Sequence, residues 1–325
     1  MSSTIRMILA VLSAALLSLG VAACGDDEGD TGGSESAATG SEGELIESDP
    51  ANEGVEVTIG SKNFTEQYIL GNVYAQALEA AGFDVSTELD LGSEQIAYRA
   101  VQEGQIDGYP EYTGTSLTSF FDYKTADVPT DAEEAYDLVV EEYAKQDITA
   151  LAMAPFNNTF VVTSTPETAE EFGATTLSDV AEAEGADEAS IAGFPECRQR
   201  TDCLLGLRDV YGWEPEFVST EAKFEPLDND QADFVFGFGT DGELSLDKYQ
   251  TYEDDQGLFP PYNPAVTMRN DAVERIGPAG VEVIERVQEP MTEEVMRELN
   301  ARVDLDKEKP EDVATQYLQE SGFIE

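Results

Sequence analysis

The pattern that most constrains the fold is an alternation of short strands and amphipathic helices near the start of the globular region. Three short segments have the apolar alternation of strands, and the two longer segments between them repeat apolar side chains at helical spacing: 55–60, 83–91 and 106–109, then 63–81 and 94–103. This order favours a parallel sheet covered by helices. The sequence therefore predicts an α/β fold.

Side chains of the expected types mark the limits of the first helix. Asn63 followed by Glu66 predicts a capping box, in which the Glu66 side chain bonds back to the helix start. Gly82 is placed to end the same helix. On the second helix we expect Ile96 to face the core with its apolar neighbours.

The same style continues to the C-terminus. Further strands and helices are predicted at the following positions: strands at 160–163, 190–192, 216–218 and 234–238, and helices at 132–145, 177–183, 202–211, 280–288, 292–303 and 310–321. Residues 55–325 number about 270, which is long for one core and natural for two lobes.

The first residues predict export. Arg6 precedes an apolar run from Met7 to Ala23, which is short for a membrane span and typical of a secretory signal. We assign residues 1–23 to a signal peptide. Small residues before Cys24 resemble a bacterial lipobox, which implies cleavage before Cys24 and lipid attachment to it. The alternatives are an uncleaved anchor, or a signal that ends in Cys by chance.

Residues 24–54 are predicted to be a flexible acidic tether that holds the globular part off the membrane. The stretch from Gly25 to Gly54 contains ten acidic residues and no Lys or Arg. It has too little apolar surface to offset the entropy of ordering, and its like charges keep it extended. A simple low-complexity linker is the alternative.

Besides Cys24, the chain has only Cys197 and Cys203, and it has no histidine. These two cysteines, six residues apart in an exported protein, predict a disulfide, with buried free thiols as the alternative. Neither a zinc site nor any cofactor is expected. Without histidine, Ser-His-Asp, Cys-His and His-metal chemistry are excluded, and we expect that the chain is not an enzyme.

The charge is strongly acidic, with a formal net charge of −51. Removing Arg6 and the ten acidic residues of 25–54 leaves 58 acidic and 16 basic residues in 55–325, a net charge of −42. Such a field repels nucleic acid and anionic lipid, so no nucleic-acid partner is expected.

Two long motifs resemble one protein family. Residues 60–72 read GSKNFTEQYILGN and residues 104–115 read GQIDGYPEYTGT. Shorter matches follow in the same order at 156–160, 195–198 with 202–204, and 239–242. Over residues 55–325 the chain is similar to the glycine betaine/choline/carnitine-binding proteins of osmoprotectant ABC importers.

The resemblance implies a type II periplasmic-binding-protein fold, an α/β fold with two lobes and a ligand cleft between them that closes about a hinge. Lobe one would comprise 55–158 with 262–325, and lobe two 159–261. The implied function is extracytoplasmic capture of glycine betaine or a related quaternary-ammonium osmolyte by a monomeric, lipid-anchored receptor. The receptor would deliver this ligand to the permease and ATPase of an importer.

The resemblance also implies a cage for the quaternary ammonium, a group that aromatic faces can hold although it donates no conventional hydrogen bond. Matching the motifs position by position assigns four rings to this cage: Tyr112, Phe160, Phe238 and Tyr262. The family commonly has Tyr where this chain has Phe160 and Phe238, and Phe keeps the π face without the hydroxyl. Ordinary core packing is the alternative for each ring.

The carboxylate of a betaine needs cations or hydrogen-bond donors. The resemblance assigns Lys62, Thr115 and Arg198 to that end, and the retention of both cations favours a betaine over choline. Surface ion pairs are the alternative for the two cations. Secondary roles are assigned to four further residues: Asn63, Tyr109, Asn158 and Asp241.

Two other classes of function stay open at this stage. A secreted hydrolase would need two carboxylates at one cleft, and the sequence singles out no such pair. A sensory or adhesive surface domain would use the same fold to bind a partner.

The acidic surface predicts that stability rises with salt, because screening weakens the repulsion among carboxylates. We expect the melting temperature to increase as NaCl rises from about 0.1 M to about 1 M. Differential scanning calorimetry across that series measures it. A flat profile would instead indicate an acidic composition without adaptation to salt.

Overall fold

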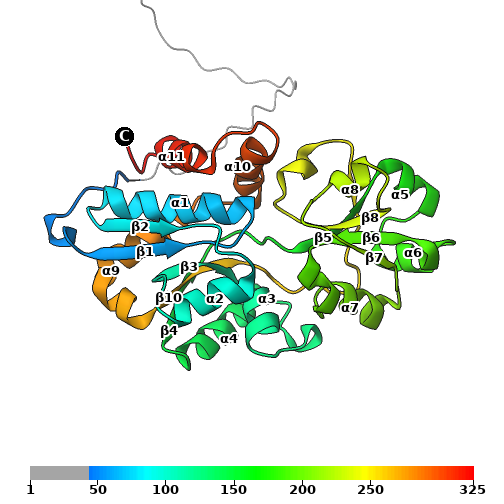
Figure 1. Cartoon of the computed structure of the whole chain (residues 1–325), viewed down its shortest axis with the longest axis horizontal. Helices are drawn as coiled ribbons and strands as arrows, with labels where there is room; N and C mark the ends of the chain where they lie inside the picture. The colour runs from blue at the N-terminus through cyan, green and yellow to red at the C-terminus, as the bar shows by residue number, and fades with distance from the viewer. Residues whose placement is uncertain (1–43) are drawn as a thin grey trace, which may run out of the picture. The chain divides into compact units, whose positions relative to one another are not determined.

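The computed structural model describes residues 44–325. The predicted signal peptide, Cys24 and the tether up to residue 43 lie outside the described residues. Helices and strands of the described part gather around two sheets (Figure 1). None of the helices in residues 44–325 is both long and apolar enough to span a bilayer.

The first sheet has the strand order β2-β1-β3-β10-β4. Its strands are β1 (Glu56–Gly60), β2 (Asp84–Glu88), β3 (Gly108–Tyr112), β4 (Ile148–Met153) and β10 (Pro264–Arg269). β1 pairs in parallel with β2 and β3, as the alternation predicts. β10 runs antiparallel to both β3 and β4, so the sheet is mixed rather than wholly parallel.

The second sheet has the order β7-β6-β8-β5-β9 and is also mixed. Its strands are β5 (Phe160–Ser164), β6 (Ser190–Gly193), β7 (Glu216–Ser219), β8 (Phe234–Phe238) and β9 (Gln250–Thr251). β6 pairs in parallel with β7 and β8, and β5 runs antiparallel to β8. That register places Phe160 directly opposite Phe238.

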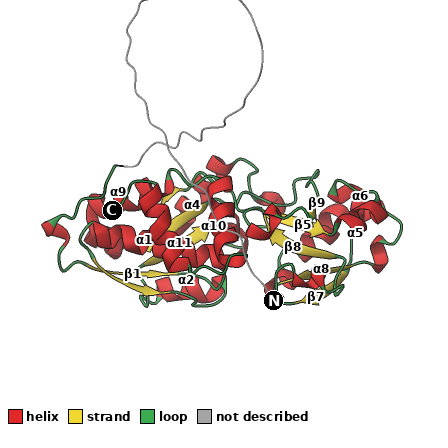
Figure 2. Cartoon of the chain, turned by 90° about the horizontal axis from the view of Figure 1, so that it is seen from above, coloured by secondary structure: helices red, strands yellow, loops and turns green. Residues whose placement is uncertain are grey.

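Helices surround each sheet. Those around the first sheet are α1 (Thr65–Ala80), α2 (Glu94–Gln102), α3 (Thr113–Thr115), α4 (Ala132–Ala144), α9 (Asn270–Gln288), α10 (Glu293–Asp304) and α11 (Pro310–Glu320). Those around the second are α5 (Pro166–Phe172), α6 (Leu177–Glu182), α7 (Leu204–Gly206) and α8 (Glu225–Asp228). Figure 2 shows α1, α10 and α11 lying together, and their apolar faces share one core with Val266 of β10.

We call the part built around the first sheet lobe one and the part built around the second sheet lobe two. The chain crosses between them twice, after β4 and again before β10. The two crossings are bonded to each other, because the Asn158 amide donates to the Tyr262 carbonyl at 3.1 Å and the Tyr262 amide donates to Asn157 Oδ1 at 2.7 Å. The residue limits predicted for the lobes, 55–158 with 262–325 and 159–261, stay predictions.

The start of α1 differs from the predicted capping box. The N-cap residue is Phe64, which makes no side-chain cap, and Asn63 is exposed. Glu66 is only 2% exposed and points inward instead of back to the helix start. On α2, Ile96 is 50% exposed, because Ala97, Ala100 and Val101 already form the buried stripe.

The tether prediction is wrong for residues 44–54, which are folded against lobe one. Ile46 is buried in its core and its amide donates to the Phe323 carbonyl at 2.9 Å. Asn52 Nδ2 donates to the Ala81 carbonyl at 2.8 Å. The acidic composition of the stretch does not predict these contacts, because the partners of Ile46 and Asn52 lie far away in the sequence.

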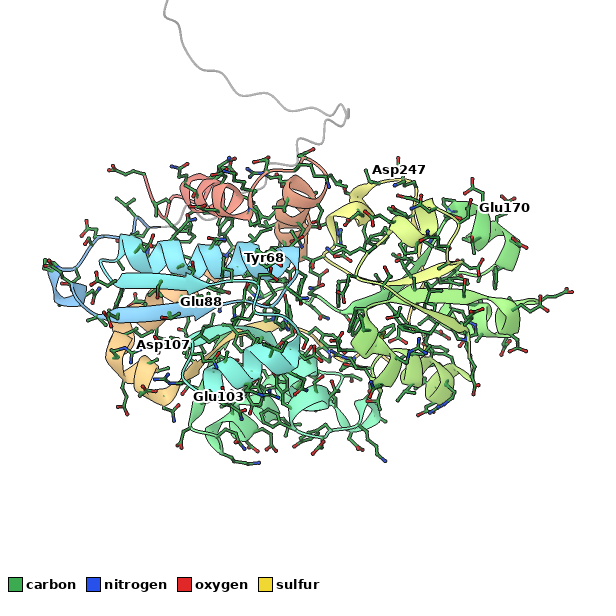
Figure 3. The ribbon with its side chains drawn as sticks, viewed as in Figure 1. Tyr68, Glu88, Glu103, Asp107, Glu170 and Asp247 are labelled. Atoms are coloured by element: carbon green, nitrogen blue, oxygen red, sulfur yellow. A yellow bond between two sulfur atoms is a disulfide. The ribbon has the colours of Figure 1, made fainter. Side chains whose placement is uncertain are left out.

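Acidic side chains extend over the surfaces of both lobes. Glu103 follows α2 in lobe one, whereas Glu170 and Asp247 belong to lobe two, and all three are exposed (Figure 3). Exposed carboxylates on both lobes are the structural basis of the expected salt dependence.

The burial of Ile46 generates a prediction about stability. Ile46→Ala should lower the free energy of unfolding by about 2 kcal/mol, because it removes buried methyl groups and leaves a cavity. Leu45→Ala is the matched control: Leu45 is 44% exposed, and the change should stay within about 0.5 kcal/mol. Urea unfolding followed by circular dichroism measures both. Equal effects of the two substitutions would show that this segment does not contribute to the core.

Candidate functional site

An aromatic cluster lies where the two lobes meet. Six of its rings are Phe64, Tyr112, Phe160, Phe194, Phe238 and Tyr262, and the rings of Phe236 and Phe259 also lie 6.2 and 5.8 Å from that of Phe160. The Phe160 centroid lies 4.9 Å from that of Phe238 and 5.4 Å from that of Tyr262. The four rings assigned from the motifs are therefore brought into one continuous cluster, with Phe64 and Phe194 added to them.

Strand ends position most of these rings. Tyr112 ends β3 and pairs with Pro264, the first residue of β10, and Tyr262 lies two residues before that strand. Phe160 begins β5 and Phe238 ends β8, facing each other across the antiparallel pair. The chain thus directs the ends of strands from both sheets toward one place.

Phe64 connects the two halves of the cluster. Its ring is stacked on Tyr112 of lobe one at 6.1 Å and on Phe238 of lobe two at 6.0 Å. Within lobe two, the Phe194 ring is stacked on those of Phe160 at 6.0 Å and Phe238 at 6.4 Å. Sequence reasoning missed both rings, although Phe64 lies inside the quoted motif of residues 60–72.

Lys62 lies against the lobe-one side of the cluster. Its buried Nζ is 4.5 Å from the Tyr112 ring centroid and 5.7 Å from that of Phe64. The same ammonium group forms an ion pair with Glu111, whose other oxygen accepts a hydrogen bond from Tyr109 at 2.8 Å. Lys62 is therefore a paired cation on an aromatic face.

The second cation at the cluster is Arg200, not Arg198. The Arg200 guanidinium carbon is 5.5 Å from the Phe160 centroid and 5.8 Å from that of Phe194. Its Nε and Nη2 groups donate to the two oxygens of Asp202 at 2.8 and 2.6 Å. The family motifs do not mark Arg200, although it lies only two residues beyond Arg198.

The structure does not bring Arg198 to the aromatic cluster. Arg198 is exposed, and its guanidinium lies 4.9 Å from the ring centroid of Phe217. The reason is the helical turn Pro195–Gln199, which buries Cys197 and directs the next side chain outward. The assignment of Arg198 to the ligand carboxylate stays a prediction, and this position does not support it.

Asp202 is the anion that holds Arg200 in place. Burial disfavours its charged form, but Arg200 and the hydroxyls of Tyr262 and Thr118 outweigh that effect and keep its pKa below the ordinary value. The Tyr262 hydroxyl donates to Asp202 Oδ2 at 2.5 Å, and Thr118 Oγ1 donates to the same oxygen at 3.0 Å. Since Thr118 belongs to lobe one, this carboxylate joins the two lobes.

The predicted disulfide is present and encloses this ion pair. Cys197 and Cys203 are bonded, with their Cα atoms 5.3 Å apart and both residues buried. Arg200 and Asp202 lie on the short loop that the bond closes. The loop that carries the second cation is therefore fixed at both ends.

Glu66 forms a second buried centre on the other side of Tyr112. Its carboxylate accepts hydrogen bonds from Tyr112 Oη at 2.8 Å, Asn158 Nδ2 at 2.9 Å and Asn300 Nδ2 at 3.0 Å. The Thr240 hydroxyl is its fourth donor. Burial raises the pKa of Glu66, and the hydrogen bonds oppose that shift. Among residues 44–325 no ion pair to this carboxylate is found within 4 Å.

The remaining predicted residues have varied positions. Thr115 is buried in α3, and Asn158 is buried at the first crossing. The Asp241 carboxylate accepts hydrogen bonds from Lys223 Nζ at 2.8 Å and from the Phe238 amide at 2.8 Å, so it orders the loop after β8. Asn63 is exposed, away from these buried contacts.

A cavity of about 410 Å³ opens beside the cluster. Lobe one lines it with Glu94 and Thr118, and lobe two with Gln199, Arg200 and Asp202. Arg200 therefore has one side toward this cavity and the other toward Phe160. No group of three His, Cys, Asp or Glu side chains suited to a metal ion occurs within the described part of the chain.

Comparisons with known proteins agree with this geometry. Residues 55–320 match the family model described as the substrate binding domain of an ABC-type glycine betaine transport system. A glycine-betaine-binding protein of Pseudomonas aeruginosa is 32% identical over 281 residues, which cover 82% of this chain and 88% of that protein. The glycine betaine-binding protein YehZ of Escherichia coli K12 is 27% identical over 279 residues, covering 82% and 91%.

The fold has a solved counterpart. A crystal structure of a glycine betaine/carnitine/choline ABC transporter superposes with a TM-score of 0.67 at 22% identity. The superposition covers 81% of this chain and 98% of that one. The two-lobed arrangement of the sheets is therefore that of periplasmic binding proteins.

Proposed function

Because the chain belongs to the family of substrate-binding domains of ABC-type glycine betaine transport systems, we propose that its aromatic cluster captures glycine betaine or a related quaternary-ammonium osmolyte. Proteins of this family are extracytoplasmic and hand their solute to a membrane permease. The observation that carries the proposal is the cluster itself, which is built by both lobes and carries one paired cation from each lobe, Lys62 and Arg200.

The cluster suits a methylated ammonium group physically. Such a cation is weakly hydrated and is attracted to the negative face of an aromatic ring, by about 0.5–2 kcal/mol for each contact. Two cations of the chain already lie on these faces, Lys62 on Tyr112 and Arg200 on Phe160. Rings of the cluster therefore already hold positive charge, and Phe160 and Phe238 supply this attraction without a hydroxyl.

Arg200 takes the role in carboxylate binding that the motifs assigned to Arg198. Two of its nitrogens are held by Asp202, while Nη1 has only a 3.8 Å approach to Glu94. A guanidinium fixed in this way presents its remaining donors toward a ligand carboxylate with little further loss of freedom. Lys62 and Thr115 are the other proposed contacts at that end.

The proposal extends to the way the receptor is held at the membrane. Cleavage before Cys24 and its acylation would anchor a monomer, with residues 24–43 as the remaining tether. The support is the order of small residues before Cys24 and the acidic, Gly- and Ser-rich composition that follows.

Isothermal titration calorimetry with glycine betaine, proline betaine, choline and carnitine tests the function. We expect glycine betaine to bind with a dissociation constant of about micromolar order. Tyr112→Ala and Tyr262→Ala should each weaken binding by about 1–3 kcal/mol, because each loses a cation–π contact and buried area. If none of the four ligands produces heat, a sensory or adhesive role for the same fold becomes the better explanation.

A pair of arginine substitutions tests which cation binds the carboxylate. Arg200→Lys keeps a positive charge near Asp202 but loses the planar guanidinium, so glycine betaine affinity should fall about tenfold or more. Arg198→Lys is the matched control and should bind like the unmodified protein, because Arg198 is exposed. Choline has no carboxylate and should distinguish the variants less. The opposite order of effects would restore Arg198 to the site.

A further inference from the structure

We propose that Glu66 is a positioning residue that couples the orientation of the Tyr112 ring to contact between the two lobes. The inference rests on the proposed function in one respect, namely that Tyr112 contacts the ligand. It assigns Glu66 a role different from the helix cap that its place after Asn63 predicts.

The two oxygens of Glu66 face different parts of the molecule. Oε1 accepts from Tyr112 Oη at 2.8 Å and from Asn158 Nδ2 at 2.9 Å. These donors are a ring of the aromatic cluster and the first crossing between the lobes. Oε2 accepts from Asn300 Nδ2 at 3.0 Å and from the Thr240 hydroxyl. One carboxylate thus joins the ligand cage to the lobe contact.

Thr240 is the donor that comes from lobe two. It lies in the loop after β8, and this loop packs directly on α10 of lobe one. Asn300 Nδ2 also donates to the Thr240 carbonyl at 2.8 Å, and Arg297 Nη2 donates to the Gly239 carbonyl at 2.8 Å. A Cβ atom on Gly242 would lie 2.4 Å from Ala301. The Thr240–Glu66 bond can therefore form only when this loop lies against α10.

A second interaction accompanies this contact without involving Glu66. Lys223 of lobe two donates to Asp241 at 2.8 Å and to Asp304 of α10 at 3.0 Å. These ion pairs hold the same loop against the same helix, and Asp241 also accepts the Phe238 backbone amide, but none of these groups bonds to Tyr112. Through its hydrogen bonds to Thr240 and to the Tyr112 hydroxyl, Glu66 therefore connects the contact between this loop and α10 to the Tyr112 ring.

The chemistry explains why a carboxylate serves at this position. Two oxygens with two lone pairs each can accept all four hydrogen bonds, and Glu66 is fully buried. Loss of the Thr240 donor leaves one oxygen of this carboxylate with a single donor instead of two, which is unfavourable while Glu66 stays buried. A phenol that donates to a carboxylate is also polarised, so its ring becomes a better partner for a cation.

Paired substitutions at Thr240 provide the test. Thr240→Val is nearly isosteric but removes the hydroxyl donor, whereas Thr240→Ser keeps it. We expect the valine variant to bind glycine betaine about tenfold more weakly, and the serine variant to bind like the unmodified protein. Hydrogen–deuterium exchange of the ligand-free full chain should become faster in residues 239–245 and 295–304 of the valine variant alone.

Two tyrosine substitutions separate the parts of the link. Tyr112→Phe should weaken ligand binding and leave exchange in those two segments unchanged, because Thr240 and Asn300 keep their acceptor. Tyr252→Phe is the matched control: it removes a buried hydroxyl that bonds Ser164 at 2.6 Å within lobe two, and it should change neither readout. Melting temperatures establish that each variant is folded.

The outcomes distinguish this inference from the proposed function. Identical affinity and exchange for the valine and serine variants would overturn the role of Glu66 even if glycine betaine binds. Faster exchange in the valine variant alone, together with no binding of any quaternary ammonium to the unmodified protein, would support the lobe link and refute the ligand.

Discussion

The meeting of the two lobes depends on hydrogen bonds from buried phenols to buried carboxylates. Tyr112 donates to Glu66, and Tyr262 donates to Asp202. Each carboxylate also accepts from a hydroxyl of the opposite lobe: Thr240 reaches Glu66 and Thr118 reaches Asp202. The two tyrosines of the aromatic cluster are thus held by the same groups that hold the lobes together, so the shape of the proposed ligand site depends on the approach of the lobes.

The two carboxylates achieve this with different electrostatics. Arg200 compensates Asp202, which keeps the pKa of that carboxyl low and its charge in place. Glu66 is held only by neutral donors, and burial raises its pKa. The chain has a net charge of −51, and of the 16 basic side chains in residues 44–325, Lys62 and Arg200 lie against the aromatic cluster. The resulting site combines anionic and cationic groups within an apolar enclosure, which suits a zwitterion better than a simple cation.

Sequence patterns located the rings better than the polar groups around them. The alternation of strands and helices predicted β1, β2 and β3, and motif order selected four rings that the structure gathers. β10 joins β3 and β4 from more than a hundred residues away, which local periodicity cannot show. Arg198 lies within the helical turn Pro195–Gln199 and is exposed, whereas Arg200 follows that turn and reaches the Phe160 ring, a difference that the sequence does not show. Glu66 fits a capping motif, and only tertiary contacts from Asn158, Thr240 and Asn300 reveal its inward position.

The central position of β10 in the first sheet has a consequence for how the chain acquires its structure after synthesis. β3 and β4 have no partner on their shared side until residues 264–269 arrive between them. All five strands of the second sheet, by contrast, lie within residues 160–251. A nascent chain that ends before residue 264 therefore has every strand of the second sheet. In the first sheet of such a chain, β3 and β4 still lack the strand that pairs with both of them. Completion of the first sheet must wait for a long-range closure, which is the slow kind of folding event.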